Sequence, residues 1–180
     1  MHGSLLHGFK EFVRRRYGEA AWNAVVQEAG AGGWYHSTQT YSDEELTALV
    51  RALAVREERP VPQLLEDFGA ALVPILLVLY KAFLEPHWRT LDLLMNAESV
   101  IHRTVRMRDP EAHPPQLFPR WISEREVQIE YRSARRLCAV ALGICRGVAD
   151  HYGDSVLVQQ TACMERGDRA CLILVRLLPE

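Results

Sequence analysis

Apolar residues in the first half of the chain recur every three to four positions, which is the spacing of helices that bury one face. Ser42 and Glu45 match a capping box at the start of one such segment. Pro74 lacks a backbone donor, so we expect the helix that contains it to kink there. The pattern predicts helices over 5–13, 22–26, 42–56, 62–84 and 90–106.

The period changes to two in the second half. Val127, Ile129 and Tyr131 alternate with polar residues and predict a strand. A helix is expected over 135–150, followed by strands over 155–162 and 170–177 that a turn at 165–168 joins. We therefore expect an α+β fold in one domain over 1–180, with a helical N-terminal half packed on a half that carries an antiparallel sheet and one long helix.

Composition narrows the possible partners and the compartment. The chain has 180 residues, 48% of them hydrophobic, and 21 basic against 23 acidic residues without a basic stripe, so nucleic acid is not expected as a partner. The longest apolar run, 70–80, is too short to span a bilayer and contains Pro74, which favours a buried core helix and no membrane contact. No export signal precedes the first helix, so we expect a cytoplasmic protein.

Tyr131, Ser133 and Arg135 form the first candidate site, because alternate residues of an extended segment project to one side. A phenol, a hydroxyl and a guanidinium offer several donors to an anion, and the arginine can grip a carboxylate with two parallel bonds. Such a set suits the paired propionates of a heme. Taken alone, the same residues also suit a solvated strand edge.

His102 is the second candidate, near the C-terminal end of the helix expected over 90–106. A neutral imidazole among apolar neighbours is a standard axial ligand of heme iron. A single histidine on an apolar face also occurs as a core residue with satisfied hydrogen bonds. His102 lies about thirty residues before Tyr131, and the two candidates are therefore interpreted together.

Together these residues resemble the heme nitric oxide/oxygen binding (H-NOX) family, which includes the heme domain of soluble guanylate cyclase. The resemblance spans nearly the whole chain and includes Met1–Gly3, Gly18–Trp22, Tyr41–Asp43, Phe68–Gly69, His102, the Tyr-x-Ser-x-Arg motif at 131–135 and the closing hairpin. It implies a heme b between the two halves of the fold, with His102 as axial ligand of the iron. Tyr131, Ser133 and Arg135 would hold the propionates, and Pro115 would press on the macrocycle.

The resemblance also places the open face of the iron against Leu5, Phe9, Pro74 and Val140, all of which are apolar. Family members that hold oxygen stably generally carry a tyrosine where this chain has Val140. Without that donor, bound oxygen loses a hydrogen bond of roughly 1.5 to 3 kcal/mol, or about ten- to a hundredfold in affinity. We therefore expect a sensor that binds NO and CO but does not hold O2 stably.

Signalling is expected to follow release of the proximal histidine, because NO weakens the bond between iron and histidine in this family. Related bacterial domains act on separate histidine kinases or cyclic-dinucleotide enzymes. The chain ends without an output domain, so the resemblance implies action in trans on such a partner.

Cys138, Cys163 and Cys171 form a further cluster, because two of them flank the expected hairpin. Some H-NOX proteins hold a structural zinc at matching cysteines and a histidine, but Gln160 stands in the histidine's place and is a poor ligand. Zinc with a substitute ligand such as water, a redox pair of Cys163 and Cys171, and three inert thiols all remain open. Cys145 is expected to be a core residue.

Rival functions make different predictions. The chain has no G-x-S-x-G, P-loop or H-E-x-x-H motif, so we do not expect an enzyme. A heme-independent small-molecule-binding adaptor would be colourless. A thiol or heme redox sensor would switch on oxidation without NO.

Overall fold

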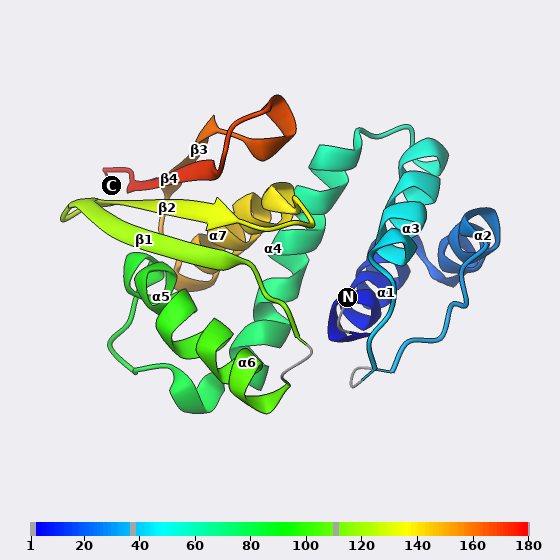
Figure 1. The fold of residues 1–180 in the computed structure, drawn as a ribbon, viewed down its shortest axis with the longest axis horizontal. Helices are drawn as coiled ribbons and strands as arrows, with labels where there is room; N and C mark the ends of the chain where they lie inside the picture. Colours follow the sequence, from blue (N-terminus) through cyan, green and yellow to red (C-terminus); the bar gives the residue numbers. More distant parts are fainter. Residues whose placement is uncertain (1–2, 37–38, 110–111, 180) are drawn as a thin grey trace. The chain divides into compact units, whose positions relative to one another are not determined.

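The computed structural model describes residues 3–36, 39–109 and 112–179, which leaves Met1 and His2 of the family motif outside the described residues. The chain divides into two compact units, Met1–Phe68 and Gly69–Glu180, and helix α4 (Val61–Leu79) crosses the division between them. Figure 1 shows the course of the chain. Each unit is described by itself.

The first unit is helical, as the apolar spacing predicts. It contains α1 (Gly3–Tyr17), α2 (Glu19–Ala29), α3 (Asp43–Arg56) and the first part of α4. The rings of Phe9, Phe12 and Phe68 form one aromatic cluster in its core, with Phe9 and Phe68 edge to face at 5.2 Å. Arg59 donates to Asp67 at 2.7 Å and to the Tyr17 hydroxyl at 3.0 Å, which fastens the start of α4 to the end of α1.

The capping box predicted at the start of α3 is wrong. Ser42 is the residue before the helix, but its side chain makes no capping hydrogen bond. The Glu45 carboxylate instead accepts the Tyr35 hydroxyl at 2.7 Å and the Gly32 amide at 3.2 Å. A buried tyrosine hydroxyl needs a partner, and Glu45 supplies it.

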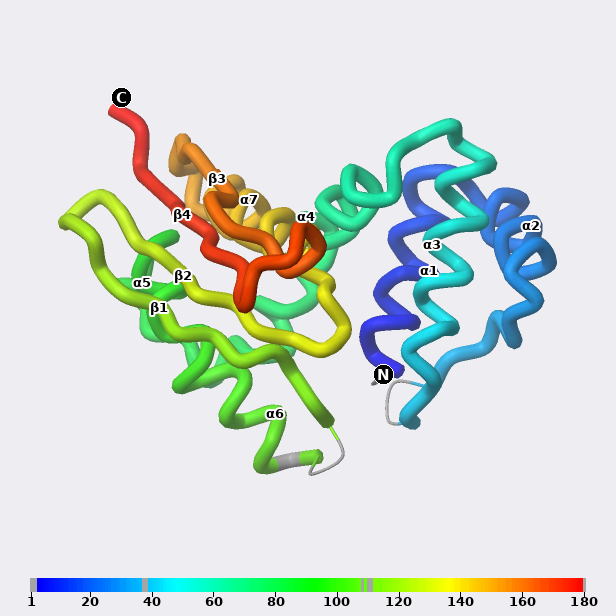
Figure 2. The backbone as a smooth tube through the Cα atoms, turned by 45° about the horizontal axis from the view of Figure 1, so that its top comes forward, coloured from blue at the N-terminus to red at the C-terminus, as the bar shows by residue number. Residues whose placement is uncertain are grey.

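The second unit contains a four-stranded antiparallel sheet in the order β1-β2-β4-β3 (Figure 2). The predicted α+β class, the closing hairpin and one long helix are thus confirmed, whereas the first strand was not predicted. The elements after α4 are η1 (Lys81–Phe83), α5 (Thr90–Asn96), the π-helical η2 (Ala97–His102), α6 (Arg103–Arg108), β1 (Gln116–Ser123), β2 (Glu126–Arg132), α7 (Cys138–Tyr152), β3 (Val156–Ala162), η3 (Met164–Arg166) and β4 (Cys171–Leu177).

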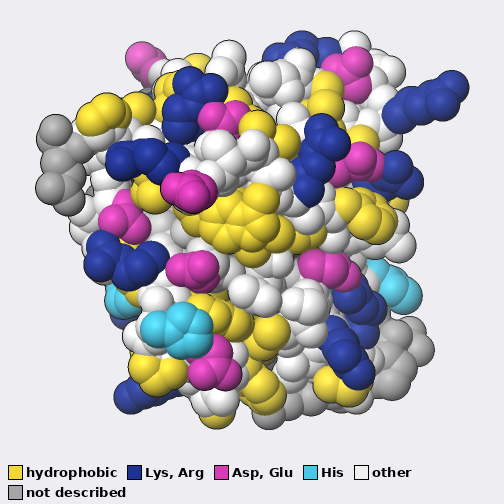
Figure 3. All heavy atoms as spheres, turned by 90° about the vertical axis from the view of Figure 1, so that its left-hand side faces the viewer, with side chains coloured by type: hydrophobic (Ala, Val, Ile, Leu, Met, Phe, Trp, Pro, Cys, Tyr) yellow, Lys and Arg dark blue, Asp and Glu magenta, His cyan; other side chains and the backbone are white. Residues whose placement is uncertain are grey.

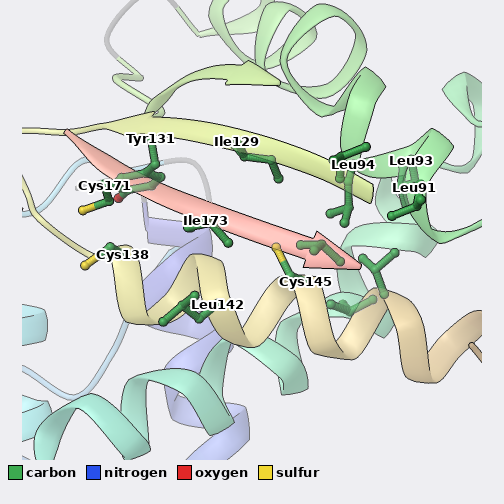
Figure 4. Close-up of a cluster of buried hydrophobic side chains, with 14 of the residues drawn as sticks. Leu91, Leu93, Leu94, Ile129, Tyr131, Cys138, Leu142, Cys145, Cys171 and Ile173 are labelled. Atoms are coloured by element: carbon green, nitrogen blue, oxygen red, sulfur yellow. The ribbon is translucent and has the colours of Figure 1, made fainter. Parts of the chain in front are cut away.

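The core of this unit lies between one face of the sheet and the helices α5 and α7 (Figure 4). Ile129 of β2 pairs with Ile173 of β4, and Tyr131 pairs with Cys171, so these four side chains point to the same face. Leu142 of α7 packs beneath them. The core therefore fixes Tyr131, the first residue of the Tyr-x-Ser-x-Arg motif (called the propionate motif below, after its predicted role), through both neighbouring strands.

The edge strand β1 carries apolar side chains at the surface. Phe118, Trp121 and Ile122 are each about half exposed. Figure 3, which looks onto the left-hand side of Figure 1, shows hydrophobic side chains gathered among charged ones on this face. The strand is therefore exposed on more than one side, which removes the clean alternation that identifies a half-buried strand.

Helices α4 and α7 cross at unusually close range because two glycines lie at the crossing. A Cβ added at Gly69 would lie 2.1 Å from the carbonyl oxygen of Val140. One added at Gly147 would lie 2.9 Å from the Cα and the carbonyl oxygen of Ala70. Both contacts involve backbone, which cannot rotate away as a side chain can, so the crossing fixes the position of Val140.

Gly69→Ala is therefore expected to lower the free energy of unfolding by more than the 1 to 3 kcal/mol that is roughly typical of overpacking. Urea denaturation followed by circular dichroism measures the change. Gly32→Ala is the matched control, because nothing lies within 4 Å of a Cβ at Gly32. Equal stability of the two variants would contradict the close crossing.

Helix α4 is less buried than the sequence predicts. It is the one described helix whose length and mean hydropathy, 1.6, match those of a membrane span, and 28% of that window is buried. Pro74, Ile75 and Val78 lie on its exposed side, and Val78 is 78% exposed. The expectation of a buried core helix is thus wrong for the second half of α4, which presents apolar surface.

Candidate functional site

His102 is the last residue of the π-helical segment η2, directly before α6. Short π-helical segments within helices are rare and often occur at functional sites. The side chain is 18% exposed. Burial lowers the pKa of His102 and outweighs the opposite effect of Glu98, so the imidazole is neutral at physiological pH. A neutral imidazole is the form that binds a metal.

The Glu98 carboxylate is the hydrogen-bond partner of this ring. Its Oε2 lies 3.1 Å from His102 Nδ1 and accepts the Leu117 amide at 3.1 Å, while its Oε1 accepts from Arg106. Burial opposes ionisation of Glu98, but these donors outweigh it and lower the pKa of the carboxyl group. Sequence reasoning missed Glu98 and Arg106, although the spacing of four residues between Glu98 and His102 was visible.

The segment 113–117 connects the two candidate sites of the sequence. The His113 carbonyl accepts from Arg135 at 2.7 Å, and the Pro115 carbonyl lies close enough to the His102 ring to favour its protonated form, against the larger effect of burial on the pKa. Two residues further on, Leu117 donates to Glu98. The structure thus brings Arg135 and His102 close to one short segment, and Pro115 is part of that segment. Their roles toward a heme remain predictions.

The propionate motif is only partly extended. Tyr131 belongs to β2, whereas Ser133 and Arg135 follow its last residue, Arg132, so the segment is not extended through Arg135 and the condition for all three side chains to project to one side is not met. Within this segment the Ser133 hydroxyl accepts the backbone amide of Arg135 at 3.2 Å, while the Arg135 side chain donates to the His113 carbonyl. Burial raises the pKa of Tyr131 to about 12, which keeps its phenol protonated and able to donate.

The four residues predicted to face the open side of the iron fall in both units. Val140 is buried on α7 and Pro74 is exposed on α4, in the second unit. Leu5 and Phe9 lie on α1 in the first unit, where Phe9 is fully buried beside Phe12 and Phe68. No side chain among these four can donate a hydrogen bond.

The second unit fits the chemistry of a heme on three counts. His102 is neutral and its Nδ1 is held by Glu98, which leaves Nε2 as the nitrogen for iron. The exposed side of α4 carries apolar residues, which a heme macrocycle requires of the protein around it. Tyr131, Ser133 and Arg135 offer donors suited to carboxylates.

Cys138, Cys163 and Cys171 come together, as the sequence predicts. Their sulfur atoms lie within 4.8 Å of one another, and all three side chains are buried (Figure 4 shows Cys138 and Cys171). Burial raises the pKa of Cys138 to about 12, and burial also raises that of Cys171. For Cys163, burial is outweighed by hydrogen bonds from the η3 backbone and the other two thiols, so its pKa is lowered. Cys163 is the first of the three to ionise.

The spacing of two of the sulfur atoms is compatible with a shared metal ion. Cys138 Sγ and Cys163 Sγ are 3.7 Å apart. A tetrahedral zinc with Zn–S bonds of about 2.3 Å separates its sulfurs by about 3.8 Å, whereas a disulfide bond is about 2.05 Å long. Gln160 has a buried Nε2 without a hydrogen-bond partner among the described residues. Cys145 is fully buried away from the cluster and belongs to the core, as expected.

Comparisons with known proteins identify the family and the fold of this chain. The model of the Haem-NO-binding (HNOB) family matches residues 2–160. An H-NOX protein from S. oneidensis, solved in the Fe(II)NO state, superimposes with a TM-score of 0.91 at 24% identity over 99% of this chain and 100% of that one. The unliganded Fe(II) H-NOX protein from K. algicida gives 0.89 at 19% identity over 100% and 98%.

A sequence relative is the soluble guanylate cyclase gcy-31 of Caenorhabditis elegans, 22% identical over 138 residues. The match covers 76% of this chain but only 20% of the cyclase, so the chain spans about a fifth of that relative. The structural matches show the fold, and the family model covers nearly the whole chain. The chain belongs to the Haem-NO-binding family, whose H-NOX domains bind heme and sense diatomic gases.

Proposed function

We propose that this chain is a heme-based sensor selective for nitric oxide, with His102 as the axial ligand of a heme b. The observation that carries the proposal is segment 113–117, which contacts both the neutral His102 and the arginine of the propionate motif. The iron, when bound, supplies the affinity for diatomic gases. Tyr131, Ser133 and Arg135 anchor the propionates, and Pro115 contacts the macrocycle.

Selectivity against oxygen rests on the absence of a hydrogen-bond donor among the four residues predicted to face the open side of the iron. The side chains of Leu5, Phe9, Pro74 and Val140 cannot hydrogen-bond to a ligand of the iron. Oxygen needs such a bond because it gains partial negative charge on iron, whereas NO and CO bind without it. The site therefore takes NO and CO and does not hold O2 stably.

The output is a change in protein contacts, not a chemical reaction. His102 would hold the iron, and η2 and α6, which contain and follow His102, would move if that bond were lost; a partner that binds one state better than the other would detect the movement. We propose a separate cytoplasmic effector, such as a histidine kinase or a cyclic-dinucleotide enzyme.

The test of this function is the absorption spectrum of the reduced protein, before and after addition of NO and again in air. We expect a Soret band that shifts with NO and shows no stable oxygen complex. A protein that remains colourless after reconstitution with heme would contradict the proposal and favour the adaptor. A partner response to oxidation without NO would favour the redox sensor.

The buried thiols support a second cofactor, and we propose that Cys138, Cys163 and Cys171 bind one zinc ion with water as the fourth ligand. Elemental analysis is expected to find about one zinc per chain in wild type and almost none in Cys163→Ser. Cys145→Ser removes an equally buried thiol outside the cluster and is expected to retain the metal. Wild-type protein that contains no zinc and has three titratable thiols would contradict the zinc proposal. The redox pair and the three inert thiols would then remain as the alternatives.

A further inference from the structure

We propose that Glu98 is a positioning residue that sets the strength of the bond between His102 and iron and couples His102 to α6 and to the sheet. The proposal rests on the proposed role of His102. Glu98 lies on η2, four residues before His102.

The carboxylate fixes the tautomer of the ring. A carboxylate only accepts hydrogen bonds, so the contact of 3.1 Å requires the proton to be on His102 Nδ1. Nε2 then carries the lone pair that binds a metal. A charged acceptor also draws the Nδ1 proton toward itself, which makes the imidazole a stronger donor to iron. Glu98 therefore strengthens the very bond that NO must weaken.

Arg106 moderates this effect. It approaches Oε1, the carboxylate oxygen that does not face His102, and its positive charge draws negative charge away from Oε2. The Leu117 amide also donates to Oε2 and holds the carboxylate in place without Arg106. Removal of Glu98's charge and removal of Arg106's charge are thus expected to act on the iron bond in opposite directions.

The Glu98 carboxylate also connects His102 to other elements of the second unit. Arg106 lies on α6 and Leu117 is the second residue of β1, so one side chain joins the ring to a helix and to the edge of the sheet. When His102 leaves the iron, the ring and Glu98 move as a pair. α6 and the start of β1 are the first elements to respond.

Resonance Raman spectroscopy of the reduced, heme-loaded protein measures the iron–histidine stretching frequency directly. We expect Glu98→Gln to lower that frequency, because a neutral amide oxygen is a weaker acceptor, and Arg106→Gln to raise it. Glu98→Gln is also expected to transfer heme to apomyoglobin roughly tenfold faster or more. Glu124→Gln removes an exposed carboxylate in the β1–β2 turn and is the matched control, with no change expected.

Opposite shifts in the two variants would support the proposal, because loss of stability alone would move both in the same direction. Unchanged frequencies in both, or shifts in the same direction, would overturn it while leaving the heme function intact. If Glu98→Gln does not retain heme, the frequency of Arg106→Gln, which keeps the Glu98 carboxylate, decides the question. Absence of any iron–histidine band in wild type would overturn the proposed function and this inference together.

Discussion

His102→Ala is expected to lose the axial bond to iron, and with it the wild-type Soret band. An alanine has no donor atom, so heme can be held only by the propionate motif and apolar contacts. Added imidazole is expected to restore the band, because it can occupy the space of the missing side chain. The fold itself changes little: Glu98 keeps two of its three donors, and the cost in unfolding free energy is about 1 kcal/mol.

The matched control is His113→Ala. His113 is exposed, and its backbone carbonyl, not its imidazole, holds Arg135, so the absorption spectrum is expected to match wild type. A His102→Ala protein with an unchanged spectrum in the ferrous and NO-bound forms would show that another residue binds the iron. Loss of the band in both variants would show that the effect is not specific to His102.

Val140→Tyr is expected to create a stable complex with oxygen in air. The new hydroxyl supplies the missing hydrogen bond, worth roughly 1.5 to 3 kcal/mol, and oxygen affinity rises about ten- to a hundredfold. The backbone of Val140 is held against Gly69 at the crossing of α4 and α7, so the substitution does not shift the helix easily. Oxygen titration followed by absorption spectroscopy measures the change.

Val140→Phe is the control that distinguishes the effect of the added hydroxyl from the effect of the added aromatic ring. Both variants enlarge a side chain that is 6% exposed, so each is expected to cost about 1 to 3 kcal/mol of stability through overpacking. Only tyrosine adds a donor. If phenylalanine raises oxygen affinity as much as tyrosine does, pocket size and not hydrogen bonding controls oxygen, and our account of selectivity fails.

Elements with a strong apolar period were predictable, and the exceptions have physical causes. The helices of the first unit, β2 and the closing hairpin follow their patterns. Strand β1 was missed because prolines precede it and Pro119 interrupts it, and because it is exposed on more than one side. The capping box failed because Glu45 instead accepts a hydrogen bond from Tyr35, which lies in the loop before the helix. The π-helical turn before His102 leaves no recognisable pattern in the sequence.

The candidate site was predictable to the extent that single residues carry its chemistry. His102, the propionate motif and the three clustered thiols stand out by type and spacing. Glu98 does not, because a glutamate four residues before a histidine is usually solvated on a helix surface. Its role depends on Leu117 and Arg106 meeting at one carboxylate, which is a tertiary arrangement.

The amide of Leu117 has a consequence for how molecules of this protein behave in concentrated solution. An exposed edge strand tends to pair with a strand of another molecule and so begins aggregation. On β1, however, Leu117 gives its N–H to Glu98, and Pro119 has none to give. Two neighbouring positions on the same side of this edge strand thus offer no donor to a foreign strand, so Glu98 also helps to keep the molecules apart.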